Sequence, residues 1–171
     1  SPEGVEWKAE YERKYRKYLN SPQPWLTRTN LHVELYPKKR AVDIKGSYDF
    51  VNRSRYNIDT VHLATALGAN NHSIRFNRVA KEVLKDEELG HHMFIFEKPL
   101  FPGDSIRLDF HVSFNPKGFP NFAIDPSLVE NGSNFGNQWL PKVGYQFDRE
   151  IDDPKEREEQ GLPPKMDIWP K

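Results

Sequence analysis

The side chains best suited to acid–base or metal chemistry in this chain are six histidines, and their spacing matches none of the common catalytic patterns. Two histidines four residues apart on one helix face would bind zinc, but neither H-E-x-x-H nor H-x-x-x-H occurs. His91 and His92 are adjacent, so on a strand they would point to opposite faces. His111 could lie beside one of them and hold a structural metal, but we expect exposed or capping histidines. The six are His32, His62, His72, His91, His92 and His111.

Signatures of other catalytic classes are absent from the sequence. There is no G-x-S-x-G nucleophile elbow, no P-loop and no G-x-G-x-x-G fingerprint. The lack of cysteine excludes disulfides, thiolate metal sites and a cysteine nucleophile. We therefore predict no catalytic residue and no metal-binding residue in this chain. A hydrolase assembled from histidines and carboxylates far apart in sequence stays open, and a clustered histidine with a raised pKa would indicate it.

The composition indicates one globular domain. The chain has 171 residues, which is about one domain, and 13% aromatic residues are too many for a disordered chain. The 25 basic and 25 acidic residues balance, so overall charge does not favour a nucleic-acid partner. No stretch approaches the ~20 apolar residues of a membrane span, and we expect this piece to be soluble.

Residues 4–19 are predicted to form an amphipathic helix. Two pairs of opposite charge at i,i+4 spacing, Glu10 with Lys14 and Glu12 with Arg16, support it. Aromatic residues at spacings of four, four and three form one stripe, which either docks on the domain or connects to an upstream segment. The stripe consists of Trp7, Tyr11, Tyr15 and Tyr18.

From about residue 25 the apolar period changes to two, which is typical of strands with one buried face. Residues 31–35 and 42–50 alternate on either side of a polar turn and predict a hairpin. Residues 106–114 form the clearest amphipathic strand, after a type II turn at residues 101–104 in which glycine supplies the positive φ. Further strands are expected at residues 58–67, 73–77 and 92–98. Short strands without intervening helices predict an all-β fold, an antiparallel β-sandwich.

The predicted organisation has three parts. Residues 1–24 form the N-terminal helix and a Pro-rich connector, residues 25–147 the sandwich, and residues 148–171 a charged linker toward a missing downstream domain. The last part of the sandwich, residues 116–147, lacks periodicity and predicts a long irregular C-terminal segment. Residues 148–160 hold seven acids and three bases, which indicates a solvated turn and linker or a contact strip for a following domain.

Three stretches, in this order, form a recognisable series. They are the hairpin 31–37 with 42–48, the turn region 97–108, and residues 140–145 with 148–150 and 161–164. The hairpin is similar to a V-x-L-x-P strand followed by an x-G-x-y strand, and the turn to a p-L-x-p-G-d-s motif. Together they resemble the N-terminal domain of aminopeptidase-N-like zinc metallopeptidases. The third stretch and the helix ending in Pro22-Gln23-Pro24 resemble the bacterial branch fused to ABC-transporter permease segments.

The resemblance implies a saddle-like sandwich that shapes a peptide cleft and packs on the catalytic domain of the same polypeptide. Zinc in that family sits on H-E-x-x-H and a later glutamate of the catalytic domain. This chain contains no H-E-x-x-H, so zinc, the peptide substrate and aminopeptidase activity are expected only in the parent protein. The permease-fused branch implies a parent anchored in a bacterial inner membrane.

Asn134 and Gln138 are the substrate-binding candidates that the resemblance implies, since a polar residue in the matching segment lines the first subsite. An amide accepts from an α-amine and donates to a carbonyl, which suits a peptide end. The alternative at these positions is a turn whose amides bond their own backbone. For the whole chain, the alternative is a stand-alone β-sandwich binding or adaptor module for a peptide, protein or carbohydrate.

Overall fold

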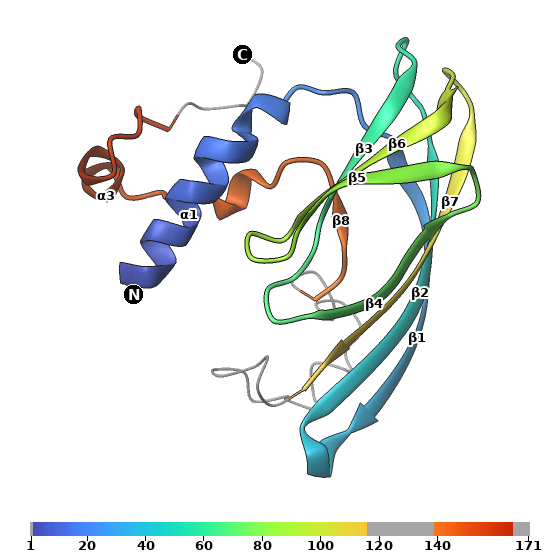
Figure 1. Cartoon of the computed structure of the whole chain (residues 1–171), viewed down its shortest axis with the longest axis horizontal. Helices are drawn as coiled ribbons and strands as arrows, with labels where there is room; N and C mark the ends of the chain where they lie inside the picture. The colour runs from blue at the N-terminus through green and yellow to red at the C-terminus, as the bar shows by residue number, and fades with distance from the viewer. Residues whose placement is uncertain (1, 116–138, 166–171) are drawn as a thin grey trace. The chain divides into compact units, whose positions relative to one another are not determined.

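The computed structural model describes residues 2–115 and 139–165, which divide into two compact units. The sandwich unit, Pro22–Val143, holds both β-sheets (Figure 1). The helical unit combines Ser1–Ser21 with Gly144–Lys171. The described strands are β1 (Trp25–Tyr36), β2 (Ala41–Val51), β3 (Ile58–Ala64), β4 (Asn70–Phe76), β5 (Ala80–Asp86), β6 (His91–Leu100), β7 (Ser105–Phe114) and β8 (Lys142–Val143).

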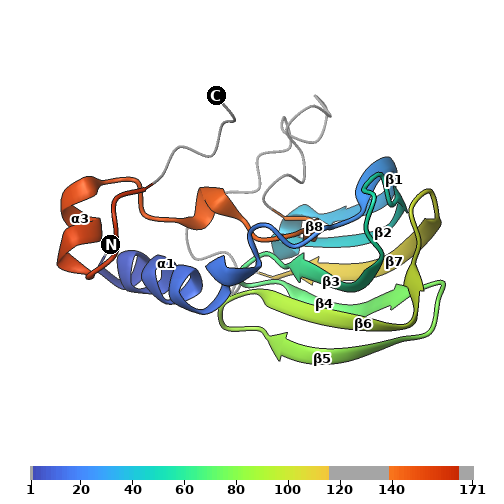
Figure 2. The same cartoon turned by 90° about the horizontal axis from the view of Figure 1, so that it is seen from above.

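The strands pair antiparallel in two four-stranded sheets, ordered β1-β2-β7-β4 and β5-β6-β3-β8 (Figures 1 and 2). This arrangement confirms the predicted antiparallel β-sandwich. The hairpin of β1 and β2 turns through the 3-10 helix η2 (Pro37–Lys39), where the polar turn was expected. Arg40 closes it with a φ of 49°, a left-handed conformation.

Apolar side chains from both sheets form one core. The even-numbered positions of β7 are buried, while its odd positions face away, as the alternation predicted. Phe76 on β4 makes edge contacts with Phe94 and Phe96 on β6, with ring centroids 5.3 and 5.2 Å apart, and so joins the two sheets.

Strand β5 was not predicted from the sequence. Its residues include three lysines or glutamates, which have low strand propensity, and the burial pattern shows little alternation. It lies at the edge of its sheet, where charged residues are the usual protection against pairing with another chain. The hydrogen-bonded pairing of β5 with β6 therefore accounts for this strand better than its own amino-acid composition does.

In the helical unit, α1 (Pro2–Tyr15) and the 3-10 helix η1 (Arg16–Tyr18) confirm the predicted N-terminal helix. The ring of Tyr11 stacks on Trp7 and on Tyr145, with centroids 5.7 and 5.1 Å apart. Its hydroxyl accepts a 2.8 Å hydrogen bond from the Gln146 backbone. No helix in the described residues combines the length and apolar character that crossing a bilayer requires.

The acidic segment of the helical unit is more ordered and more buried than expected. It contains η3 (Phe147–Arg149) and α3 (Pro154–Glu159), whose first turn is capped by Asp153. Glu150, Ile151 and Arg157 are all buried. The prediction of a solvated segment was therefore wrong for these three residues. The cause lies in long-range ion pairs, which take the place of the expected Glu12–Arg16 helix pair: Glu12 binds Arg157, and Arg16 binds Glu150.

Candidate functional site

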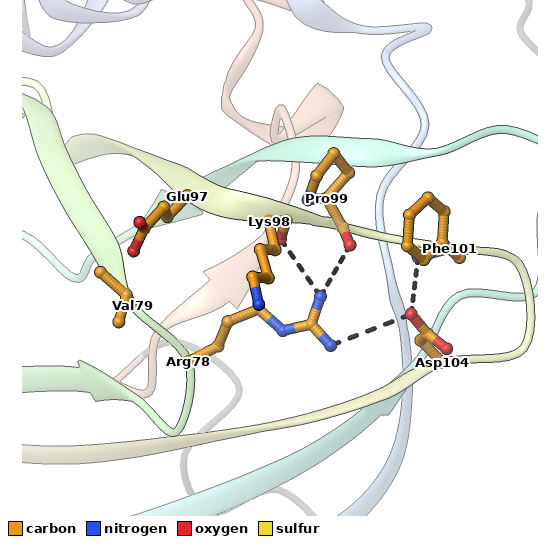
Figure 3. A pocket seen from close by; sticks show the side chains of 7 residues that line it. All are labelled: Arg78, Val79, Glu97, Lys98, Pro99, Phe101 and Asp104. Carbon is orange, nitrogen blue, oxygen red and sulfur yellow. Dashed lines mark hydrogen bonds and ion pairs between the residues drawn. The ribbon is translucent and has the colours of Figure 1, made fainter.

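A pocket of about 410 Å³ lies beside the turn that connects β6 to β7 (Figure 3). Both charged and apolar side chains line it, and two of the apolar ones are strongly exposed: Val79 at 68% and Phe101 at 53%. The lining residues are Arg78, Val79, Glu97, Lys98, Pro99, Phe101 and Asp104. None of these seven offers a hydroxyl, thiol or imidazole; the pocket is lined by two basic side chains, two carboxylates and three apolar side chains.

Arg78 shapes this pocket by holding the strand and the turn together. Its Nη1 donates to the carbonyl oxygens of Lys98 and Pro99 at 3.2 and 2.8 Å. Its Nη2 lies 3.9 Å from Asp104 Oδ2, the oxygen that also accepts a 2.8 Å bond from the Phe101 backbone (Figure 3). The guanidinium is therefore committed to the turn.

Asn52 holds the same turn through side-chain and backbone bonds. Its side-chain amide donates to the carbonyls of Leu100 and Tyr56 at 2.9 and 2.7 Å. Its backbone carbonyl accepts from Gly103 at 2.8 Å, and its backbone amide donates to Asp104 at 2.9 Å. The φ of Gly103 is 86°, which confirms the positive φ predicted for the type II turn. The wall of the pocket is thus a rigid turn.

Three histidines are buried inside sheet β5-β6-β3-β8, so the expectation of exposed or capping side chains was wrong for them. His62, His91 and His92 are at most 2% exposed. His62 Nδ1 and His91 Nε2 are 3.1 Å apart, so one ring donates to the other. Burial lowers the pKa of His62, opposite to the raised pKa that a clustered acid–base site would show. This pair is a packing element of the sheet.

Thr65, His92 and Glu82 follow the order of a hydrolytic triad without its accessibility. His92 Nε2 lies 3.2 Å from the Thr65 hydroxyl, and its Nδ1 lies 3.3 Å from Glu82 Oε1. However, Thr65 and His92 are each only 1% exposed, so a substrate cannot reach the hydroxyl. A nucleophile needs an accessible reacting atom, and this cluster therefore does not favour the hydrolase alternative.

The sequence-predicted substrate residues Asn134 and Gln138 lie outside the described residues, and their role stays a prediction. His111, expected beside His91 or His92, lies instead in the opposite sheet on β7. Asn52 and Arg78 were not predicted from the sequence, because a buried asparagine and a turn-holding arginine carry no local signal. Only the Pro-Gly turn that they hold was visible in the sequence.

The described residues thus define an antiparallel β-sandwich with a rigid turn-side pocket. Neither a protein-family model nor a curated protein matches the sequence. Among solved structures, the M1 zinc metallopeptidase from Deinococcus radiodurans is similar over 57% of this chain and 21% of its own, with 16% identity and a TM-score of 0.45. A two-domain M1 zinc metallopeptidase bound to L-arginine is similar over 63% of this chain and 23% of its own, with 16% identity and a TM-score of 0.45.

The native LTA4 hydrolase from yeast is similar over 57% of this chain and 16% of its own, with 15% identity and a TM-score of 0.41. The region matched in the first of these metallopeptidases spans about a fifth of that protein's length.

Proposed function

We propose that this chain is the non-catalytic N-terminal β-sandwich domain of a zinc aminopeptidase-like protein. The observation that carries the proposal is that residues of the three sequence motifs build one sandwich. Tyr48 of the first motif donates a 2.7 Å hydrogen bond to the carbonyl of Pro141 in the third. Gly46 of the first motif lies under the ring of Phe110, where a Cβ would be 2.3 Å from the ring. The second motif forms the turn held by Asn52.

Strand β1 supports a role in packing on another domain. It is a 12-residue edge strand, and most of its residues are exposed. Trp25 is 58% exposed, Leu26 44% and Leu31 38%. Proteins commonly cover long edges and apolar patches of this kind. We infer that the downstream catalytic domain of the same polypeptide covers β1, and that the sandwich forms one wall of its peptide cleft.

The finer parts of the proposal rest on the sequence resemblance. Zinc would be held by the catalytic domain of the parent protein, and Asn134 and Gln138 would orient the amino end of the peptide. The parent would be anchored in a bacterial inner membrane through permease segments, with residues 148–171 leading to the catalytic domain. The boundaries of the three parts, at residues 24 and 147, belong to this proposal.

Peptidase assays test the proposal. We expect no hydrolysis of aminoacyl or tripeptide substrates by the purified 171-residue chain with added Zn²⁺. In the parent protein, we expect Asn134→Ala and Gln138→Ala each to raise KM about tenfold, the size of one lost hydrogen bond, while Asn137→Ala leaves it unchanged. Turnover by the 171-residue chain alone, or a parent that cleaves no peptide, would contradict the proposal.

The turn-side pocket favours the alternative, a stand-alone adaptor that binds an apolar side chain between Val79 and Phe101. In that case the 171-residue chain would bind peptides with an aromatic or aliphatic residue, and Phe101→Ala would abolish binding. Val83→Ala is a matched control, because Val83 is an exposed valine on β5 that does not line the pocket. A titration followed by NMR separates the two functions.

A further inference from the structure

The outer face of sheet β1-β2-β7-β4 brings together two imidazoles and a carboxylate from three strands. Asp43 lies on β2, His72 on β4 and His111 on β7. Apolar residues of β2 and β7 alternate with these positions and face the core, so the two side chains on these strands face outward. His111 Nε2 donates to Asp43 Oδ1 over 2.7 Å. One donor atom from each of the three residues lies within 4.8 Å of the others.

A β-bulge brings the third residue into this group. The register of β4 against β7 shifts between Asn71 and Ser73, and Ser73 lies opposite His111. His72 is therefore the extra residue of the bulge, and bulges of this kind redirect a side chain. Its ring centroid is 4.4 Å from that of His111, and its Nε2 is 2.6 Å from the Ser113 hydroxyl. Ser73 is paired with His111, which faces outward. Without the bulge, strict alternation would therefore turn His72 to the opposite face of the sheet, away from His111.

The group is accessible from solvent and lies on a face with further negative charge. The side chains of Asp43 and His111 are 26% and 28% exposed, and His72 is exposed. Glu34 of β1 lies directly opposite Asp43 in the register and adds a second carboxylate to this face. Lys45 lies opposite His111 and is the opposing cation. The register partners on β1 and β2 thus add one carboxylate and one ammonium group beside Asp43 and His111.

We propose that Asp43, His72 and His111 bind a divalent transition-metal ion, with Zn²⁺ the best match to two nitrogen donors and one carboxylate oxygen. Zn²⁺ holds such atoms at about 2.0–2.2 Å, which separates tetrahedral ligands by about 3.3 Å. His111 Nε2 and Asp43 Oδ1 are 2.7 Å apart, and one donor atom from each of the three residues lies within 4.8 Å of the others, so rotation of the side chains completes the site.

Three protein donors leave the fourth position to water or to a ligand. This site would revise the sequence-based prediction of no metal-binding residue in the chain. It is independent of the zinc proposed for the catalytic domain.

The test is Zn²⁺ binding by the 171-residue chain, measured by calorimetry, with Co²⁺ as a spectroscopic probe. We expect one ion per chain and visible Co²⁺ bands of low-coordinate geometry. His72→Ala, His111→Ala and Asp43→Asn should each weaken Zn²⁺ binding by more than the roughly 10- to 100-fold that loss of an outer-shell partner costs. His32→Ala is the matched control, because it removes an exposed histidine from the neighbouring strand β1 and should leave affinity unchanged.

Circular dichroism without metal establishes that each variant folds. Asp43→Asn and His72→Ala are the substitutions least expected to disturb folding, because the first is nearly isosteric and the second replaces an exposed side chain. Zn²⁺ should raise the Tm of the wild type and of His32→Ala, but not that of the three site variants. The proposal is overturned if the wild type binds no stoichiometric Zn²⁺, if the site variants bind as tightly as the wild type, or if His32→Ala costs as much as they do.

Discussion

Each of the two compact units of this chain is stabilised internally by a different kind of interaction. The interior of the sandwich unit is formed largely by aliphatic and aromatic side chains from two sheets. The helical unit instead buries charge. Arg157 donates to both carboxylate oxygens of Glu12 at 2.8 and 2.9 Å, and also to the carbonyls of Ile151 and Pro163 at 2.9 and 2.8 Å. Arg157 is 1% exposed and Glu12 3%.

A second buried carboxylate extends this polar network. Glu150 is fully buried and accepts bonds from Arg16 at 2.7 Å and from the Tyr145 hydroxyl at 2.6 Å. Burial, and then the hydrogen bond to Glu150, raise the pKa of Tyr145, so its phenol stays protonated and donates.

The small helical unit depends on polar contacts for its specificity. A few dozen residues cannot bury a large apolar core. Stacked aromatic rings supply part of the attraction, and we infer that the paired charges favour this docking, because a wrong partner would leave a charge buried alone. Apolar cores generally tolerate apolar exchange as long as volume is kept. We therefore expect charge changes to damage the helical unit and volume changes to damage the sandwich.

The largest effect is expected for Glu12→Ala, which leaves the Arg157 guanidinium buried without its carboxylate. Removing one partner of a buried ion pair costs about 3–5 kcal/mol. Hydrogen exchange of the α1 amides should report this loss in the helical unit. Glu10→Ala is the control, since the exposed Glu10–Lys14 pair contributes about 0–1 kcal/mol. Equal exchange in the two variants would show that the buried pair is not what stabilises this unit.

A smaller effect is expected for Gly46→Ala in the sandwich. The added Cβ would lie 2.3 Å from the Phe110 ring, and overpacking of this kind costs about 1–3 kcal/mol. Urea unfolding measures the cost in the wild type and in a Phe110→Leu background. The smaller side chain should absorb part of the cost, so an identical loss in both backgrounds would refute the steric explanation.

The smallest effect concerns the buried histidine pair, the polar exception in the sandwich. The folded-state pKa of His62 is lowered below its unfolded value of about 6.5. The unfolded chain therefore takes up a proton first as the pH falls, and stability is lost below about pH 6.5. The slope is at most about 1.4 kcal/mol per pH unit for one proton. His62→Gln should flatten the acid side of the stability profile, and an acid profile identical to that of the wild type would contradict this explanation.

The alternation of apolar residues and the turn residues predicted the strands and the turn that depend on local sequence. Alternation gave the hairpin of β1 and β2 and the strand β7, and Pro102-Gly103 gave the turn. Strand β5 was missed because its pairing with β6, rather than its composition, makes it a strand. Glu12 illustrates the same limit, because its helix neighbour Arg16 was the obvious partner and the true one lies in α3.

Predicting the candidate sites required knowledge of contacts between residues far apart in sequence, more so than predicting the strands did. The contact of His72 with His111 needs both the order of strands in the sheet and a bulge that no motif announces. Asn134 and Gln138 remain sequence-based candidates for substrate binding. The motifs carry only a resemblance, and the structure adds that their residues Gly46, Tyr48 and Pro141 take part in packing the sandwich.

We propose that this sandwich serves a zinc peptidase domain in the same polypeptide. The most direct measurement is to sequence the source reading frame on both sides of the 171 residues. We expect an H-E-x-x-H motif with a later glutamate downstream, and apolar spans upstream. A frame that closes soon after Lys171 would contradict the claim, and the turn-side pocket would then become the first place to search for a ligand.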